Sequence, residues 1–517
     1  MKARLLFAER DFPLTIGYTY RNGYTLSAPA LPPNADDLIQ DLELETLLTA
    51  MAGSDGLIFA LAKLMLLSSI SNPDEIVYRQ EILADCLAHP ELAREIYTTA
   101  AEAIAGQSRV YQPLGNSPSG VLRRAVEVLE FFVGSLRRLR VLADENVSSV
   151  NSRGMRTLFM TLREQLDDEY FAVIAEHLQR LKFRSGMLLS ADLGPGCRGA
   201  GYILRTPQET KRSFFERFGA PPRHALYFEV HPRDEAGARM LGELNDRGIN
   251  LVANAVAQST DHILSFFELL CGEIGFYVGC LNLADDLRSK KAPFAFPEPA
   301  PLGQRRFTSK GLYDVSLAIS LGRGIVGNDL AAKGKSLFVV TGANQGGKST
   351  FLRSVGLAQL MMQCGMFVGA SAFAADVVDG IFTHYKREED SSMTSGKLDE
   401  ELARMSQIVD WIHANSLLLS NESFAATNER EGSEIAREIV NVLLAHKVKV
   451  VLVTHLYDLA HGFRDHRSDE MFFLRAERED TGERTFRLIE ADPLETSYGE
   501  DLYHQIFEQP TQALAAE

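Results

Sequence analysis

The sequence predicts a mostly α-helical first half followed by an α/β domain with a parallel sheet. Two observations carry this prediction. Apolar residues recur at helical spacing from about residue 38 to 288, and short apolar strands alternate with helices from about 305 to 505. The 517 residues are enough for two to four domains with sizeable cores.

Composition and charge narrow the class of protein. No run of about 18 apolar residues occurs, so we expect no membrane span. Charged residues at 9–11 interrupt the first apolar patch, which excludes a secretion signal. The five cysteines include no C-x-x-C pair, which indicates a reducing, cytoplasmic compartment. A formal net charge of -16 argues against nucleic acid over the whole surface but leaves room for a local basic groove.

The helical half has recognisable segments. We expect helices at 42–51, 76–87, 121–142 and 155–183, and again from about 234 to 288. Several glycines and the strand-like residues 225–230 predict a short sheet insertion. We therefore divide the chain into a strand-rich or irregular segment (1–37), a helical region (38–291, with the insertion at about 184–235), a proline-rich linker (292–304) and the α/β domain (305–517).

A phosphate-binding loop is the most specific feature. An apolar strand, Leu337–Val340, precedes the pattern G-x-x-x-x-G-K-S at Gly342–Ser349, and a helical segment follows. Glycines let backbone N–H groups converge on a phosphate, and the helix N-terminus adds a partial positive charge. Lys348 would reach the terminal phosphates, and Ser349 would offer its hydroxyl to Mg²⁺. The candidate nucleotide-binding residues of this P-loop are Gly342, Ala343, Asn344, Gln345, Gly346, Gly347, Lys348, Ser349 and Thr350.

A second glycine pattern carries less information. Residues Gly194–Gly199 match G-x-G-x-x-G, a dinucleotide-binding fingerprint. No helical pattern follows at once and Pro195 stiffens the segment, so we interpret it as an ordinary turn.

Two further strand ends carry polar residues. Hydrolysis by a P-loop domain needs a carboxylate to order Mg²⁺ and another to activate water, usually after an apolar strand beside the P-loop strand. Ser416–Glu422 is the best candidate: Glu422 would activate the water, and Asn421 stands where an aspartate would be expected. The apolar strand Val450–Val453 leads to His455, which could contact the γ-phosphate or the attacking water.

The order of these motifs resembles the MutS family of DNA mismatch-repair ATPases. Thr341–Thr350 reads TGANQGGKST against the family's TGPNMGGKST, and Asn421–Gly432 has the spacing of its D-E-x-G-R-G-T-S-T-x-D-G. Other segments also resemble the family. Ile381–Asp390 resembles its strand and acidic turn, Thr454-His455 resembles its Thr-His pair, and Ser497–Gly499 resembles its late S-Y-G. Pro73–Gln80 and 259–288 look like parts of its core and lever domains. Ile325–Leu330 resembles the segment that lines the adenine pocket, so Ile325, Val326 and Asn328 are candidates there.

The resemblance implies an ABC/MutS-type P-loop NTPase domain that uses ATP and Mg²⁺, joined to a helical core/lever region. It also implies a dimer, with Ser391–Gly396 of one subunit facing the nucleotide of the other. Two departures are visible: Asn421 replaces the aspartate, and Phe424–Ala426 replaces Gly-Arg-Gly. With no mismatch-reading domain or Phe-x-Glu wedge recognised, we expect structured or branched DNA rather than a single mismatch as the target.

Alternatives remain at this stage. An ATP-gated scaffold with weak or no hydrolysis would act through a protein partner. The large helical half disfavours a small-molecule phosphotransferase, and the lack of an LSGGQ-like segment disfavours an ABC transporter subunit. Two basic clusters fit either DNA phosphates or solvated helix faces: Arg123, Arg124, Arg137, Arg138 and Arg140, and Arg180, Lys182 and Arg184.

Overall fold

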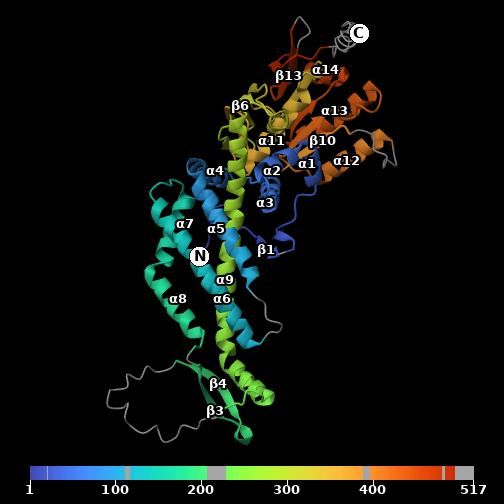
Figure 1. Ribbon diagram of the computed structural model, residues 1–517. Coiled ribbons are helices and arrows are strands. Elements are labelled where there is room, and N and C mark those ends of the chain that lie inside the picture. The colour runs from blue at the N-terminus through green and yellow to red at the C-terminus, as the bar shows by residue number, and fades with distance from the viewer. Residues whose placement is uncertain are drawn as a thin grey trace, which may run out of the picture.

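A long helical arm projects from an α/β head in the computed structural model (Figure 1). The structure describes residues 1–19, 21–110, 117–184, 186–206, 229–387, 396–479 and 484–494. We use "head" for the two sheets between residues 298 and 490 with their helices, and "arm" for the helices between residues 90 and 289 with the hairpin at their far end.

The N-terminal elements lie where the arm meets the head. Strands β1 (Thr15–Thr19) and β2 (Gly23–Ser27) form an antiparallel hairpin. Four helices follow: α1 (Ala35–Asp41), α2 (Leu44–Ala52), α3 (Gly56–Leu67) and α4 (Pro73–Ala88). Side chains fix two of their starts, because Asp55 accepts from the first amides of α3 and Asn72 caps α4, which begins with a proline.

The arm is built on one helix of 55 residues, α9 (Glu235–Ser289), which at 1.5 Å per residue is about 80 Å long. It packs along α5 (Pro90–Arg109) and α6 (Pro118–Asn146). The helix predicted over 155–183 is two helices, α7 (Arg153–Gln165) and α8 (Asp168–Leu181), because Asp167 caps a new start by accepting from Tyr170.

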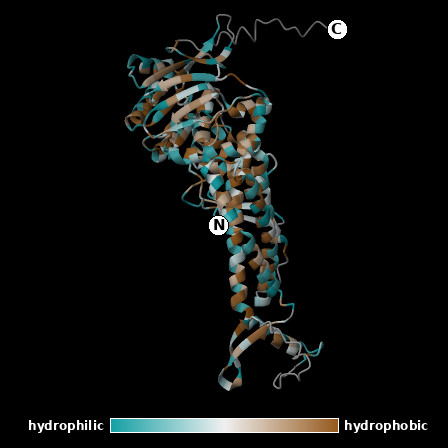
Figure 2. Cartoon of the chain, turned by 90° about the vertical axis from the view of Figure 1, so that its left-hand side faces the viewer, coloured by the Kyte–Doolittle hydropathy of each residue, from teal (hydrophilic) through white to brown (hydrophobic). Residues whose placement is uncertain are grey.

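The far end of the arm carries the predicted insertion. Strands β3 (Leu188–Leu193) and β4 (Gly199–Arg205) form a hairpin, and the G-x-G-x-x-G pattern makes its turn. Of the strand predicted at 225–230, residues 225–228 lie outside the described residues, and 229–230 are not part of a strand. Figure 2 shows apolar residues on this hairpin, where Leu193 is 79% exposed.

Helix α9 contains an apolar stretch that the prediction of no membrane span had missed. Among the described residues it is the one helix long and apolar enough to cross a membrane. Its 18-residue apolar window is 72% buried inside the fold, by α2, α3 and α5 among others. Burial in the protein core therefore accounts for its composition.

The head contains two sheets rather than the single parallel sheet that was predicted. The larger has the order β10-β11-β12-β8-β13-β14, with all pairs parallel except the last. Its strands are β8 (Leu337–Gly342), β10 (Ile381–Tyr385), β11 (Leu417–Asn421), β12 (Lys449–Val453), β13 (Met471–Arg478) and β14 (Arg484–Glu490). The smaller has the order β5-β9-β6-β7, with strands β5 (Glu298–Ala300), β6 (Arg306–Leu312), β7 (Asn328–Lys333) and β9 (Ala372–Asp376).

The proline-rich stretch 292–304 is not merely a linker. Its residues Glu298–Ala300 form β5 and pair in parallel with β9 at the edge of the smaller sheet. Pro299 is tolerated there because an edge strand leaves one side without ladder partners.

Alternate side chains of the large sheet enter two different cores. Phe338, Val340 and Leu419 face the smaller sheet and helix α11 (Lys348–Gln363), in a core that also takes in α2 to α5 and α9. On the opposite face, Leu337, Val339 and Leu418 pack on α12 (Lys397–Trp411), α13 (Glu429–Ala445) and α14 (Tyr457–Asp465). A short helix, α10 (Val315–Leu321), completes the head.

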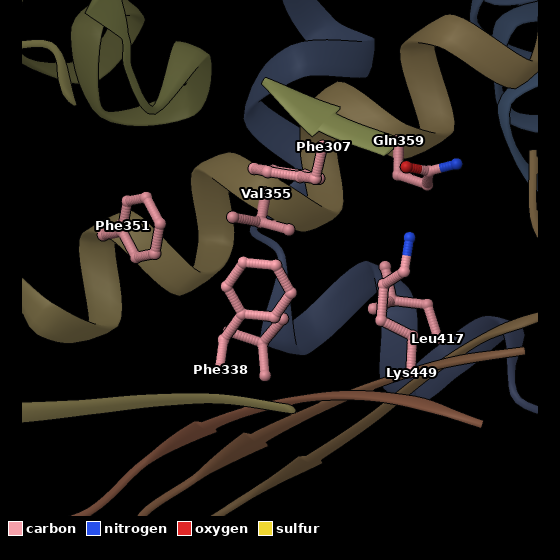
Figure 3. Close-up of a pocket in the computed structure, with 8 residues that line it drawn as sticks. Phe307, Phe338, Phe351, Val355, Gln359, Leu417 and Lys449 are labelled. Carbon is pink, nitrogen blue, oxygen red and sulfur yellow. The ribbon is translucent and has the colours of Figure 1, made fainter. Parts of the chain in front are cut away.

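The layer between α11 and the large sheet is tightly packed (Figure 3). Phe338, Phe351 and Val355 surround a void of about 10 Å³, roughly what one water molecule needs. The ammonium of Lys449 reaches into this layer and donates to buried Asp376 at 2.6 Å. This void is far too small to hold a ligand larger than water.

Candidate nucleotide-binding site

The P-loop has the strand–loop–helix geometry that its sequence predicts. Gly342 ends β8 with φ of +110°, and a Cβ there would lie 2.8 Å from the backbone nitrogen of Ala476. Gly347, with φ of +87°, is the N-cap of α11. A side chain at Gly342 would collide with β13, so the glycine is required by both conformation and space.

Lys348 is buried inside this loop, with 5% of its surface exposed. Its ammonium donates to the carbonyl oxygens of Gly342 and Ala343, each at 3.0 Å. Burial lowers the pKa of Lys348, and the nearby carboxylate of Glu422 opposes that shift. The cation therefore lies at the centre of the loop, while Asn344, Gln345 and Ser349 are exposed at its mouth.

Ser349 and Asn421 meet across the sheet edge. The hydroxyl of Ser349 donates to the side-chain oxygen of Asn421 at 3.0 Å, although the two residues are 72 positions apart. The expectation that the Asn421 strand lies directly beside the P-loop strand is wrong, because β12 separates β11 from β8. The contact between Ser349 and Asn421 still forms because Ser349 lies in the first turn of α11, which packs on both β11 and β12.

Glu422 and His455 form the second polar pair at this edge. Glu422 follows β11 in the left-handed conformation, with φ of +54°, and its amide donates to the carbonyl of Val453 at the end of β12. His455 follows β12, and its Nδ1 lies 3.8 Å from a carboxylate oxygen of Glu422. Both side chains are about one-third exposed, so a ligand in the loop can reach them.

The donor set suits a hard cation. Ser349 and Asn421 offer neutral oxygens, and Glu422 adds a carboxylate next in the chain. Mg²⁺ takes oxygen ligands and usually needs few from the protein when phosphates supply others. Among the described residues, no group of three or more His, Cys, Asp or Glu side chains is placed to hold a metal ion.

The segment that was predicted to line an adenine pocket reaches the P-loop through β14. Asn328 is buried and accepts from the amide of Leu488 on that strand at 2.7 Å. Ile325 is half-buried and Val326 is 41% exposed. The side-chain oxygen of Asn328 is therefore engaged in fixing β14.

Sequence reasoning missed β14 as part of the site. Arg484 donates to the carbonyl of Asn344 at 3.0 Å, and the backbone of Phe486 lies against Gly347. Phe486 has φ of +59° and is 51% exposed. No local motif marks these residues, because their proximity depends on the antiparallel return of β14 beside β13.

Three predicted segments lie outside the described residues: Glu388–Asp390 of the acidic turn, Ser391–Ser395 of the loop expected to face a partner subunit, and Ser497–Gly499.

The basic clusters proposed for DNA lie on α6, on α8 and just beyond it. Most of these residues already have partners within the arm: Arg123 with Glu127, Arg138 with Glu102, Arg140 with Asp144, Arg180 with Glu176, Lys182 with Glu130, and Arg137 over the ring of Phe171.

Two protein-family models match the chain. The MutS2 N-terminal domain matches residues 71–290, which cover α4 to α9, and MutS domain V matches residues 338–515. The helices from α4 to α9, and the part of the head from β8 onward, therefore each match a MutS-type domain.

Curated proteins match parts of the chain. MutS protein homolog 4 of Homo sapiens is 29% identical over 201 residues, which are 37% of this chain and 22% of that protein. DNA mismatch repair protein MutS of Leuconostoc citreum is 31% identical over 163 residues, 31% of this chain and 19% of the relative. MutS of Leptospira interrogans is 24% identical over 269 residues, 51% of this chain and 30% of the relative. The matched segments thus span less than a third of each relative. From the two domain matches and these relatives, the chain belongs to the MutS family.

Proposed function

We propose that this chain binds and hydrolyses ATP with Mg²⁺, and that ATP-driven closure of a homodimer is coupled to DNA binding in repair or recombination. One observation carries the proposal. The P-loop, the Ser349–Asn421 pair and the Glu422–His455 pair all lie at the carboxyl ends of three neighbouring parallel strands, β8, β12 and β11. In open α/β sheets ligands bind at that edge.

The binding roles follow from the position of each group. The amides of Gly342–Thr350 and the N-terminus of α11 bind the phosphates, and Lys348 adds its charge. Ser349 and Asn421 would hold Mg²⁺, which would supply positive charge against the phosphate oxygens. Ile325, Val326 and Asn328 border the adenine.

The hydrolytic roles fall to the second pair. Glu422 takes the proton of the attacking water, because its carboxylate lies next to Asn421 at the mouth of the loop. His455 orients that water from the neighbouring strand end. The two groups are 3.8 Å apart, so they can share contact with one water molecule or phosphate oxygen.

Coupling to DNA would use the arm. Helix α9 runs about 80 Å from the head to the exposed hairpin β3–β4, so a small rotation at the head becomes a large displacement at the hairpin (Figure 1). The relatives named above are mismatch-repair proteins or homologues of MutS. We propose structured or branched DNA as the target and a cytoplasmic location, since all five cysteines are free thiols and four are buried.

A second candidate function is favoured by Asn421. An asparagine at the metal position lacks the charge of an aspartate, so ATP could bind without efficient hydrolysis. The chain would then be an ATP-gated scaffold that acts through a protein partner.

Steady-state hydrolysis of Mg²⁺-ATP tests the proposal. Purified protein is assayed alone and with duplex, mismatched or branched DNA, and Lys348→Ala provides the blank. We expect turnover that disappears in the blank and changes with one class of DNA. Tight ATP binding without turnover, and without response to any DNA, would overturn the hydrolytic proposal in favour of the scaffold.

A further inference from the structure

A buried imidazole lies directly behind the loop that carries Glu422. His384 is on β10, where it pairs with Ser420 of β11, and none of its surface is exposed. Its Nδ1 lies 2.6 Å from the hydroxyl of Ser423, and its Nε2 lies 3.0 Å from the carbonyl oxygen of Glu401 on α12. The ring therefore connects the residue after Glu422 to a helix on the outer face of the sheet.

The proton positions follow from these partners. A carbonyl oxygen only accepts, so Nε2 must carry the hydrogen and donate it to Glu401. Burial lowers the pKa of His384 to about 4, which leaves the ring neutral near pH 7. Nδ1 is then an acceptor for the hydroxyl of Ser423, and Ser420 donates to the Ser423 oxygen at 2.7 Å. This tautomer gives both ring nitrogens a partner, while the Ser423 hydroxyl divides its one proton between Nδ1 and the backbone carbonyl oxygen of His384, which lies 3.0 Å away.

Phe424 is fixed by the same group of residues. Its ring stacks on that of His384, with centroids 5.4 Å apart, and only 2% of the residue is exposed. Its amide donates to the carboxylate of Glu401. On the other side, Gly432 of α13 packs so closely that a Cβ there would lie 2.4 Å from the carbonyl oxygen of Phe424.

The loop held in this way has an unusual backbone. Glu422 and Phe424 both have positive φ, +54° and +61°, and Ser423 lies between them. Non-glycine residues are strained in this conformation and keep it only where the surroundings enforce it. Two strained residues on either side of one anchored serine indicate that the anchor maintains the strain.

We infer that His384 is a positioning residue for hydrolysis, which orients the carboxylate of Glu422 by holding Ser423 and Phe424. This inference rests on the proposed function. His384 does not touch the P-loop contacts of Lys348 or Ser349, so its loss should leave ATP binding intact. A misplaced general base slows the chemical step, so the defect should appear in kcat.

Two amide substitutions at His384 test the contributions of Nδ1 and Nε2 separately. Asparagine places an amide where Nδ1 lies and can still accept from Ser423, whereas glutamine reaches the Nε2 position and keeps only the bond to Glu401. We expect His384→Asn to retain most of the turnover. His384→Gln and Ser423→Ala should each lose about tenfold or more in kcat, with KM for ATP changed less than about threefold. Melting temperatures should be similar for the Asn and Gln variants, because both lose the same ring.

The outcomes distinguish the inference from the function on which it rests. If wild-type turnover does not exceed that of Lys348→Ala, the proposed hydrolysis fails and the positioning role fails with it. If the wild type is active but the Asn and Gln variants have equal kcat, or if kcat falls only in proportion to folded protein, hydrolysis stands and the positioning role is overturned.

Discussion

Replacing Asn421 with aspartate tests whether this residue limits the proposed ATP hydrolysis. Asn421 accepts from Ser349 at 3.0 Å, and its side chain is half-buried at the end of β11. The substitution Asn421→Asp keeps the shape of the side chain and adds a negative charge at the oxygen that faces Ser349. The charge should strengthen the binding of Mg²⁺ and of the waters around it.

The size of the effect follows from the bonds that form only when Mg²⁺ binds. A hydrogen bond from a metal-bound water to a neutral amide oxygen contributes about 1 kcal/mol, and a charged acceptor roughly doubles that. One such bond strengthened by the aspartate gives about 1–1.5 kcal/mol, which corresponds to roughly a tenfold lower half-saturating Mg²⁺ concentration. We expect kcat to rise or stay constant, because Glu422 is unchanged.

The assay is ATP turnover as a function of free Mg²⁺ at saturating ATP. Asn428→Asp is a matched control, because Asn428 is exposed on the same loop and caps α13, a position where aspartate serves equally well. If Asn421→Asp shifts neither the Mg²⁺ dependence nor kcat by more than the control does, Asn421 does not limit metal binding. The scaffold interpretation would then lose its basis.

Three further substitutions test other parts of the structure. Burial raises the pKa of Glu273 from 4.5 to about 7. The protonated carboxyl therefore stabilises the folded protein fully below pH 4.5, and this contribution of roughly 3 kcal/mol is lost as the pH rises to about 7. Urea unfolding of Glu273→Gln from pH 5 to 8 should lack this loss, and the same pH dependence as in the wild type would contradict the prediction. Arg353→Met leaves the buried carboxylate of Asp314 without its cation and should lower the free energy of unfolding by about 3–5 kcal/mol. The double variant Arg353→Met/Asp314→Asn should recover part of that loss, and equal stability of the two variants would refute the pairing. Gly342→Ala should abolish binding of a fluorescent ATP analogue while the protein remains folded, and near-normal affinity would show that the loop tolerates a Cβ.

The sequence was most informative where function depends on local spacing. The P-loop could be placed because all four fixed positions of its eight-residue pattern agree, as do the flanking strand and helix. The helix predicted at 76–87 is α4, which begins three residues earlier, at Pro73, because Asn72 caps it and proline suits the first turn. The single long helix predicted over 155–183 is wrong because Asp167 caps the start of a second helix. Apolar periodicity alone does not reveal such a break.

Lateral order and long-range contacts could not be predicted in the same way. The position of β12 between β8 and β11 depends on how strands that are separated by helices pack together, and no motif records it. The approach of Phe486 to the P-loop depends on the antiparallel return of β14. His384 and Ser423 are 39 residues apart and belong to different strands, so only the fold brings them into contact.

Helix α11 explains how the nucleotide site can influence the arm. Near its start, Arg353 pairs with Asp314 and with Glu43, which lies between α1 and α2. At its end, the fully buried Arg79 of α4 donates to the carbonyl of Cys364 at 3.1 Å, an arrangement that also complements the helix dipole. Helices α2 and α4 both pack on α9. We therefore propose that a displacement of α11 by a bound phosphate would reach the arm, because both ends of this helix contact elements that pack on α9.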